Sequence, residues 1–336
     1  MANRYGTEGD DVLDGTFVAD NIAGYGGNDL LRGFAGNDVL WGGYGDDRMD
    51  GGPSADTFYG LSGFDAATYE YATSGVIIRL DGAVCQNGVA QGDKLYSVEE
   101  VVGSSFNDQL FGLDGFAETL RGGDGDDTVL GSTGADDLRG GAGSDTLAYV
   151  LSDSGVAVNL ATSTASGGDA QGDTIAGFEH LSGGYGNDTL VGNNIANRLS
   201  GGAGNDTLRG GGGADVIGGG IGRDQMWGGS GADTFFFSSP SDSGTTAATR
   251  DRIMDFSRSQ GDRIDLGIDD WTGTPGIPNP FEFRGQNGFT DERQVRFVHQ
   301  DGDTIVQVNL SGASGAELAI QIEGIVNLQA SDFILG

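Results

Sequence analysis

A nine-residue repeat dominates the chain and constrains its fold more than any other feature. From Gly6 the nonamers GTEGDDVLD, GTFVADNIA, GYGGNDLLR and GFAGNDVLW follow one another without a gap. Glycine recurs at positions one, two and four, aspartate at position six and an apolar residue at position eight. Eighteen copies form three tracts, residues 6–68, 103–148 and 183–236, and the second tract has one extra residue near Phe116. Such a constant period predicts a solenoid.

The residue types within each nonamer predict its local structure. Glycine tolerates positive φ and close backbone approach, so the first six residues can form a tight loop. The last three residues then form a short strand whose middle side chain points inward. Two nonamers make one coil, and loops two repeats apart stack on the same side. Because one repeat alone buries little, the core arises only by stacking. The predicted fold class is all-β, a parallel β-roll of the β-helix or solenoid type.

The acidic composition predicts what holds the loops together. The chain has 50 acidic and 17 basic residues, with a net charge of −33. Stacked aspartates at position six would repel one another unless a cation lay between them. Carboxylate and carbonyl oxygens suit a hard cation, and flexible loops favour calcium over the strict octahedron of magnesium. A solvated acidic turn at each aspartate would not explain the period of nine. We therefore predict calcium, with at most about twelve ions between stacked loops.

The predicted calcium ligands are position-six aspartates and position-four glycines. The aspartates are Asp11, Asp20, Asp29, Asp38, Asp47, Asp56, Asp65, Asp108, Asp127, Asp136, Asp145, Asp188, Asp206, Asp215, Asp224 and Asp233. The glycines are Gly27, Gly36, Gly45, Gly125, Gly134, Gly143, Gly204, Gly213, Gly222 and Gly231. Glu118 and Asn197 stand at position six of two other copies. We expect weak or absent calcium there, because glutamate is one methylene longer and asparagine carries no charge.

The repeat resembles GGxGxDxUx, the motif of RTX or haemolysin-type calcium-binding proteins. With eighteen copies in register, the resemblance covers most of residues 1–236. It implies a calcium-bound parallel β-roll over that region.

Two inserts interrupt the repeats, at residues 69–102 and 149–182. They align with a constant shift of 80 residues, so that AQGD at Ala90–Asp93 matches AQGD at Ala170–Asp173. We expect each insert to form longer turns of the same roll, and similar inserts are familiar in the repeat modules of bacterial alginate epimerases. Four acidic residues of the inserts either bind further calcium or hydrogen-bond the loops: Asp93, Asp173, Glu99 and Glu179.

The last hundred residues differ in composition, since residues 237–336 hold only 12 of the 65 glycines. Alternating stretches such as RQVRFVHQ and TIVQVNL predict antiparallel strands. The segments GGSGADTFFFSSPSDS, RDRIMDFSRSQGDRIDL and LQASDFIL resemble the C-terminal domain of serralysin-type secreted metalloproteases. That resemblance implies a β-rich capping domain over residues 237–336 and a type I export signal near Asp332–Leu335. Four further aspartates either bind a terminal calcium or close turns: Asp251, Asp255, Asp262 and Asp265.

Several function classes are excluded on sequence grounds. A charge of −33 argues against nucleic-acid binding. The chain contains no run of 18 apolar residues, so no transmembrane helix is predicted. The start MANRYGTEGDD lacks the apolar core of a signal peptide. The two histidines, His180 and His299, form no H-E-x-x-H motif, and no G-x-S-x-G elbow occurs. Since repeats already begin at residue 6, we expect no catalytic domain ahead of them. We expect no catalytic residues and no organic cofactor.

These features predict a secreted bacterial protein that folds on extracellular calcium. It would leave the cell through a type I secretion apparatus, without a cleaved N-terminal signal peptide. The predicted role is structural or adhesive, at the cell surface or in a matrix. The alternative, from the likeness to epimerase modules, is an anionic-polysaccharide-binding module. Five position-nine side chains would then line one face: Arg32, Trp41, Arg121, Arg139 and Arg209.

Overall fold

The computed structural model describes residues 3–267, 281–312 and 315–335, and this part of the chain is all β. It has no α-helix there and three 3-10 helices, η1 (Gly88–Ala90), η2 (Gly168–Ala170) and η3 (Ala330–Asp332). No described helix is long and apolar enough to cross a membrane. The backbone divides into two compact units, described separately below. Unit 1 is Met1–Tyr149 with Ser163–Phe178, and unit 2 is Val150–Thr162 with Glu179–Gly336.

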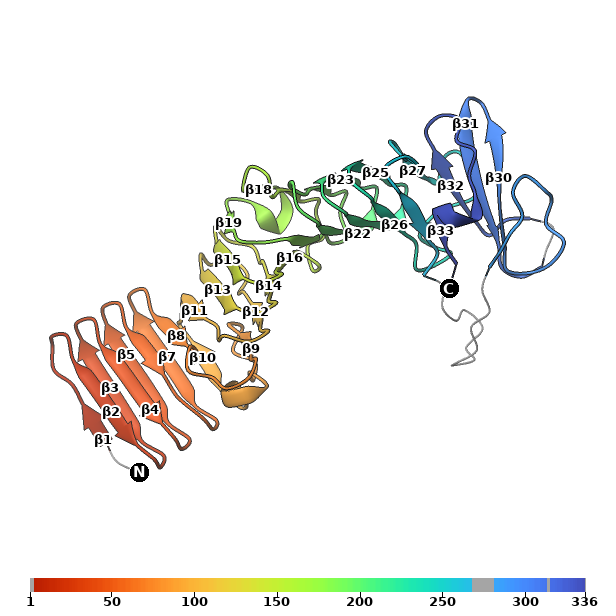
Figure 1. Ribbon diagram of the computed structural model, residues 1–336. Helices are drawn as coiled ribbons and strands as arrows, with labels where there is room; N and C mark the ends of the chain where they lie inside the picture. The colour runs from red at the N-terminus through yellow and green to blue at the C-terminus, as the bar shows by residue number, and fades with distance from the viewer. Residues whose placement is uncertain (1–2, 268–280, 313–314, 336) are drawn as a thin grey trace. The chain divides into compact units, whose positions relative to one another are not determined.

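Unit 1 consists mainly of parallel strands (Figure 1). One sheet contains β1 (Asn3–Tyr5), β3 (Asn21–Gly26), β5 (Val39–Tyr44), β7 (Thr57–Ser62) and β10 (Lys94–Tyr96). A second contains β2 (Val12–Thr16), β4 (Leu30–Phe34), β6 (Arg48–Asp50), β8 (Ala66–Thr68), β11 (Glu100–Val102), β13 (Thr119–Asp124), β15 (Asp137–Ala142) and β19 (Thr174–Ala176). A third contains β9 (Ile77–Arg79), β12 (Gln109–Phe111), β14 (Thr128–Leu130) and β16 (Thr146–Ala148), while β18 (Thr164–Ser166) runs antiparallel to β19.

Unit 2 continues the same parallel pattern and adds antiparallel strands. One row is β17 (Ala157–Asn159), β21 (Thr189–Val191), β23 (Thr207–Gly212), β25 (Gln225–Ser230) and β27 (Asp251–Ile253). The other is β20 (His180–Ser182), β22 (Arg198–Gly204), β24 (Val216–Gly222), β26 (Thr234–Phe236), β28 (Arg263–Asp265) and β33 (Phe333–Ile334). The strands β30 (Gln294–Gln300), β31 (Asp303–Asn309) and β32 (Leu318–Ile322) are antiparallel, and β29 (Glu282–Phe283) pairs with β30. Because β32 pairs with β27, the antiparallel strands join the edge of the roll.

The register confirms that two nonamers make one coil. Leu13 pairs with Leu31, and Ile22 pairs with Leu40, each 18 residues further along the chain. Position-eight side chains all point into the space between the sheets, where Ile22, Leu31, Leu40 and Phe58 are fully buried. The predicted parallel β-roll is therefore present, with its core built only where coils stack.

The glycine pattern has a different cause at each position. Left-handed φ values occur at positions two and four, whereas position one was also predicted to use them. At position two even Tyr25, Phe34 and Leu61 have φ values of 76°, 73° and 82°. Position one needs glycine for space, because a Cβ on Gly24 would overlap the carboxylate of Asp29.

The duplicated inserts have the same structure under the 80-residue shift. The helix η1 corresponds to η2, β9 to β17 and β10 to β19. In the first insert β9 pairs with β12 and β10 with β7, so its strands lie within the sheets of unit 1. In the second insert β19 pairs with β15 in unit 1, whereas β17 pairs with β21 in unit 2.

Candidate calcium-binding loops

The position-six aspartates form hydrogen-bonded ladders along the stacked loops. The backbone N–H of Asp20 donates to Oδ1 of Asp38 at 2.7 Å, and that of Asp38 donates to Oδ1 of Asp56 at 2.7 Å. Within a tract, one oxygen of the later carboxylate thus joins its loop to the loop one coil earlier. Asp108 and Asp188, at the start of their tracts, instead accept the N–H groups of Val76 and Val156 in the inserts. Asp11 is half-buried and the other predicted aspartates are buried: Asp20, Asp29, Asp38, Asp47, Asp56, Asp65, Asp108, Asp127, Asp136, Asp145, Asp188, Asp206, Asp215, Asp224 and Asp233.

The second carboxylate oxygen divides the loops into two classes. In the first class, here called open loops, Oδ2 is buried and has no hydrogen-bond donor among the described residues. Open loops are those of Asp29, Asp38, Asp47, Asp56, Asp65, Asp127, Asp136, Asp206, Asp215, Asp224 and Asp233. Because a buried carboxylate oxygen without a donor is costly, each open loop is a place where a cation would be stabilising.

Oxygen atoms from two successive loops converge in the open loops. The point that a Cβ of Gly24 would occupy lies in close contact with both Oδ2 of Asp29 and the carbonyl oxygen of Gly42, which belongs to the next loop on that side. The arrangement recurs at Gly33, Gly122 and Gly210, and it is also present at Gly103 and Gly183, which belong to loops where Oδ2 has a donor. Carboxylate and carbonyl oxygens are the donors that calcium prefers, so the residues present fit that ion.

The position-four glycines shape these loops. Nine of the ten predicted glycines have φ values between 101° and 157°: Gly27, Gly36, Gly45, Gly125, Gly143, Gly204, Gly213, Gly222 and Gly231. A Cβ on Gly45 would overlap the backbone of Gly27 in the preceding loop on that side. Gly134 lacks the left-handed conformation. These glycines therefore permit both the turn and the close stacking of loops.

In the second class, here called closed loops, the position-six side chain accepts a hydrogen bond from its own loop. The N–H of Thr16 donates to Oδ2 of Asp20 at 2.7 Å, and the Thr16 hydroxyl donates to the same atom at 2.7 Å. Thr7 makes the same two bonds to Asp11, at 2.6 and 2.9 Å. The carboxylate oxygen that an open loop leaves without a donor is satisfied here by the protein itself.

Every tract begins with two closed loops. The N–H of Ser104 donates to Oδ2 of Asp108, and the N–H of Gly184 to Oδ2 of Asp188. At Asn197 the side-chain oxygen accepts the N–H of Asn193 at 2.7 Å, while its Nδ2 donates to the Glu179 carbonyl at 2.8 Å. Glu118 similarly accepts the N–H of Leu113 at 3.2 Å. Sequence reasoning singled out Glu118 and Asn197 but missed the four closed loops that contain aspartate.

The insert carboxylates also close loops. Asp93 accepts the N–H of Asp56 through Oδ1 at 2.7 Å and the hydroxyl of Tyr69 through Oδ2 at 3.1 Å. The duplicated pair is the same, since the Tyr149 hydroxyl donates to Oδ2 of Asp173 at 2.6 Å. Glu99 accepts the N–H of Asp65 at 3.0 Å. Of the two alternatives, this geometry corresponds to hydrogen bonding within the roll.

The aspartates after the third tract behave unequally. Asp255 accepts the N–H groups of Gly228 and Gly229, both at 2.9 Å, and therefore closes a turn. Asp262 accepts the N–H of Asp233 at 3.1 Å and that of Ser257 at 2.8 Å. Asp265 lies in β28. Asp251 accepts the N–H of Asp224 at 2.8 Å, but its Oδ2 is buried without a donor among the described residues, as in an open loop.

Burial raises the pKa of the open-loop carboxyls. Desolvation, followed by repulsion from neighbouring carboxylates, raises the pKa of Asp47 to about 6, of Asp65 to about 7 and of Asp56 to about 8. The backbone N–H that each accepts lowers the pKa but does not cancel the burial. The charged form is therefore disfavoured in these loops unless positive charge is supplied.

Side chains alone would not make these sites. No group of three histidine, cysteine or acidic side chains able to hold a metal occurs in the described ranges. A cation between open loops would take most of its ligands from backbone carbonyls. Of the two histidines, His180 accepts the N–H of Arg198 at Nδ1 and His299 contacts the Val326 carbonyl.

The position-nine residues predicted to line one face are divided between sheets. Arg32, Arg121 and Arg139 lie on the sheet of β4, β13 and β15, but Trp41 lies on β5 in the other sheet. In unit 2, Arg209 lies over the ring of Trp227 at 3.8 Å from its centroid. The prediction of one continuous face was therefore wrong.

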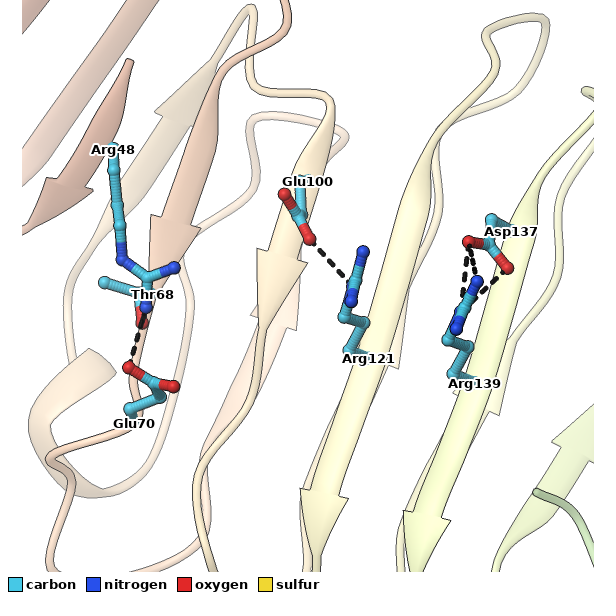
Figure 2. Close-up of polar contacts among 7 residues, drawn as sticks. All are labelled: Arg48, Thr68, Glu70, Glu100, Arg121, Asp137 and Arg139. Atoms are coloured by element: carbon cyan, nitrogen blue, oxygen red, sulfur yellow. Dashed lines mark hydrogen bonds and ion pairs between the residues drawn. The ribbon is translucent and has the colours of Figure 1, made fainter. Parts of the chain in front are cut away.

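The arginines of unit 1 are also engaged in ion pairs. Arg121 pairs with Glu100 at 2.8 Å and Arg139 with Asp137 at 2.8 Å, as Figure 2 shows. In the same view Arg48 contacts Glu70 at 2.7 Å. Arg32 pairs with Asp14 at 3.3 Å. These neighbouring acids reduce the positive charge available to an anionic polysaccharide.

Two protein families match the chain. The RTX calcium-binding nonapeptide repeat matches residues 5–33, 32–66 and 114–147. The peptidase M10 serralysin C-terminal family matches residues 170–335. The stacked loops thus belong to a calcium-binding class of repeat. The chain is an RTX repeat protein with a serralysin-type C-terminal region.

Solved structures resemble parts of the chain. The AlgE6R3 subunit of the Azotobacter vinelandii mannuronan C5-epimerase is 33% identical over 44% of this chain and 77% of its own, with a TM-score of 0.31. The AlgE6R2 subunit of that enzyme is 28% identical over 44% and 88%, with a TM-score of 0.31. The extracellular lipase LipA of Serratia marcescens is 14% identical over 99% of this chain and 40% of its own, with a TM-score of 0.29. The search of curated proteins found no match.

Proposed function

We propose that this protein is an extracellular calcium-binding roll that folds when it meets calcium. The observation that carries the proposal is the row of open loops, in which a buried Oδ2 has no hydrogen-bond donor among the described residues. The RTX repeats supply the family context, since they are calcium-binding repeats.

The physical argument concerns the calcium-free chain. Folding would bury carboxylates that carry much of the net charge of −33, and glycine-rich loops lose more backbone freedom than other sequences do. Calcium supplies the opposing charge, so its binding free energy becomes folding free energy. The aspartates of the open loops, with backbone carbonyls of adjacent loops and of the position-four glycines, would hold at most about twelve ions. Closed loops would hold none.

Calcium-dependent folding would also permit export of the unfolded chain. Calcium outside a cell is about millimolar, the range in which extracellular calcium modules bind. The unfolded chain would pass through a type I secretion apparatus and fold outside, where a bacterium would keep it at its surface or release it. In the folded state Asp332 pairs with Arg258 at 2.6 Å, and Phe333 is buried in β33 beside β28. The proposed export signal would therefore be readable only before folding.

The biological role that fits best is structural or adhesive, without enzymatic activity. Both matched families describe a repeat and a C-terminal region. Folded rolls with regular, ladder-bonded faces would serve as spacers or attachment modules in a matrix.

The test is calcium-dependent folding of the full chain. Circular dichroism in excess chelator at neutral pH should show a largely unfolded chain, and about millimolar calcium should restore the β signal. Magnesium at the same concentration should restore much less, because it requires smaller and stricter octahedral geometry. An unchanged spectrum after exhaustive chelation would contradict the proposal.

A further inference from the structure

A row of aromatic side chains lies on the outer face of the first sheet of unit 1. The position-nine residues of β1, β3, β5, β7 and β10 are in register: Tyr5, Ala23, Trp41, Tyr59 and Tyr96. Trp41 and Tyr59 stack with centroids 4.0 Å apart and planes 13° apart, and Tyr59 and Tyr96 stack at 5.1 Å and 14°. The row is thus a column of nearly parallel rings running across the strands.

Ala23 interrupts this column. Adjacent strands lie about 4.8 Å apart, so Tyr5 and Trp41 start from backbone positions about 9.6 Å apart. Because one face of Trp41 is covered by Tyr59, its opposite face is turned toward the gap above Ala23. A ring inserted there would make two stacking contacts of about 4.5 Å each, which together match the spacing.

The gap is part of a cavity of about 710 Å³. Its walls include Tyr25, which stacks with Tyr5 at 6.1 Å, and Tyr44, while Asn21 lies beside Ala23. The neighbouring position-two residues also alternate between large and small side chains, because Gly43 lies in register between Tyr25 and Leu61. The cavity is therefore bordered by large side chains and contains the two small residues Ala23, in the strand, and Gly43, in the loop.

We propose that this cavity, here called the Ala23 slot, binds a neutral sugar ring of a glycan. The C–H face of a pyranose is apolar and carries partial positive charge, which complements the negative face of an aromatic ring. Its hydroxyl groups remain at the rim, where Tyr44 and Ser62 offer polar atoms. The volume lies within the usual range for small-molecule pockets.

Charge selects the class of glycan. None of the residues lining the slot is charged, and the chain as a whole carries −33. A polyanion would gain no ion pair in the slot and would be repelled by the molecule. The inference goes beyond calcium-dependent folding. It also differs from the anionic-polysaccharide alternative, which combined Trp41 with four arginines that do not line the slot.

The experiment is affinity electrophoresis of the calcium-loaded full chain in gels containing laminarin, hydroxyethyl cellulose, galactomannan or chondroitin sulfate. We expect retardation by at least one of the three neutral polysaccharides and none by the sulfated one. Trp41→Ala should weaken binding about tenfold by removing one stacking wall. Ala23→Trp should abolish binding by completing the aromatic column. Trp227→Ala, which removes an aromatic residue at position nine of unit 2, is the matched control and should bind like the parent.

Circular dichroism in calcium establishes that each variant is folded, and analytical ultracentrifugation tests self-association. The proposal is overturned if no neutral polysaccharide retards the parent, if only chondroitin sulfate does, or if Ala23→Trp binds normally. It is also overturned if Ala23→Trp abolishes a dimer instead, since a second copy would then occupy the slot. A normal calcium response with no glycan binding would reject this inference alone and leave calcium-dependent folding intact.

Discussion

The loops of Asp20 and Asp38 are neighbours on one side of the roll, yet they differ in whether Oδ2 of the position-six aspartate has a hydrogen-bond donor. In the Asp20 loop, Thr16 at position two donates two hydrogen bonds to Oδ2. In the Asp38 loop, Phe34 at position two has a φ of 73°, and Oδ2 has no donor among the described residues. Position six is identical in both loops. In this pair of loops, the conformation of position two separates an aspartate that the protein satisfies from one that would require a cation. The loop of Asp136 is an exception, because Ser132 at position two has no left-handed φ and Oδ2 still has no donor among the described residues.

Closed loops come first in every tract, and open loops follow. A coil that satisfies its own carboxylates does not depend on calcium for its polar balance. We expect each closed coil to provide a stacking surface for the calcium-dependent loops behind it.

Removing open-loop charge should damage calcium binding far more than removing closed-loop charge. The double variant Asp38→Asn with Asp47→Asn should bind about one ion fewer per converted loop and require severalfold more calcium to fold. The matched double variant Asp11→Asn with Asp20→Asn should change little, because Asn197 shows that a closed loop accepts asparagine. Elemental analysis and calcium titrations followed by circular dichroism measure both. Equal losses in the two variants would refute the division.

Acid should partly replace calcium. Burial raises the folded-state pKa of Asp56 to about 8, of Asp65 to about 7 and of Asp47 to about 6, above the usual value of 3.8. The folded state of the calcium-free chain therefore binds protons more tightly than the unfolded state does. Its relative stability is greatest below about pH 4 and is lost as the pH rises through 6 to 8.

In chelator, the β signal should accordingly be stronger at pH 5 than at pH 8. The calcium required for folding should rise between pH 5 and pH 8, because the protons that stabilise the folded carboxyls are lost over that range. Thermal melts at both pH values, with and without calcium, measure this. If the chelated chain were more stable at pH 8 than at pH 5, burial would not have raised the pKa of the open-loop carboxyls.

The tyrosines of the inserts should matter moderately. Tyr69→Phe removes the only hydroxyl shown to donate to Oδ2 of Asp93, and Tyr149→Phe does the same for Asp173. Leaving a buried acceptor unsatisfied costs about 1–3 kcal/mol, so each variant should melt a few degrees lower in calcium. Tyr71→Phe is the control, because Tyr71 is 77% exposed. A control variant that melts as low as the other two would show that the hydroxyl bonds are not the cause.

The smallest effect concerns a closed loop restored to the repeat pattern. Asn197→Asp recreates aspartate at position six, but the N–H of Asn193 still closes the loop. We expect no additional bound calcium and a melting temperature close to that of the parent. An extra ion by elemental analysis would show that position six, and not position two, determines occupancy.

Much of this architecture could be predicted from the sequence. The period of nine predicted the coil of two nonamers, and the pairing of Ile22 with Leu40 confirms it. The two loop classes could not be read from position six, because closure depends on the backbone conformation of position two. A hydroxyl side chain at position two accompanies closure at Thr7, Thr16 and Ser104 but not at Ser132, whose loop leaves Oδ2 of Asp136 without a donor among the described residues. Glycine at position two usually accompanies an open loop, yet the N–H of Gly184 closes the loop of Asp188.

The aromatic column shows the same limit. Position nine was read as one face, but successive nonamers alternate between two sheets, so only every second residue belongs to the same row. Tyr5, Ala23 and Trp41 are 18 residues apart, and a nine-residue comparison mixes them with Arg32 of the other sheet. The slot becomes visible only when the sequence is compared in steps of one full coil.

The ladder of Oδ1 contacts also determines how such a protein can change in length. Within the first tract, the aspartates from Asp29 to Asp65 satisfy the N–H groups of the loops 18 residues before them, as Asp38 does for Asp20. If 18 residues are lost or gained within a tract, each loop N–H still meets an aspartate Oδ1, and each side chain stays on its own sheet. A change of nine residues would transfer everything beyond it to the opposite side, moving the aromatic column and the ion-paired face. We therefore expect length variants of this roll to differ by whole coils, so that genetic slippage in steps of 54 nucleotides is tolerated where steps of 27 are not.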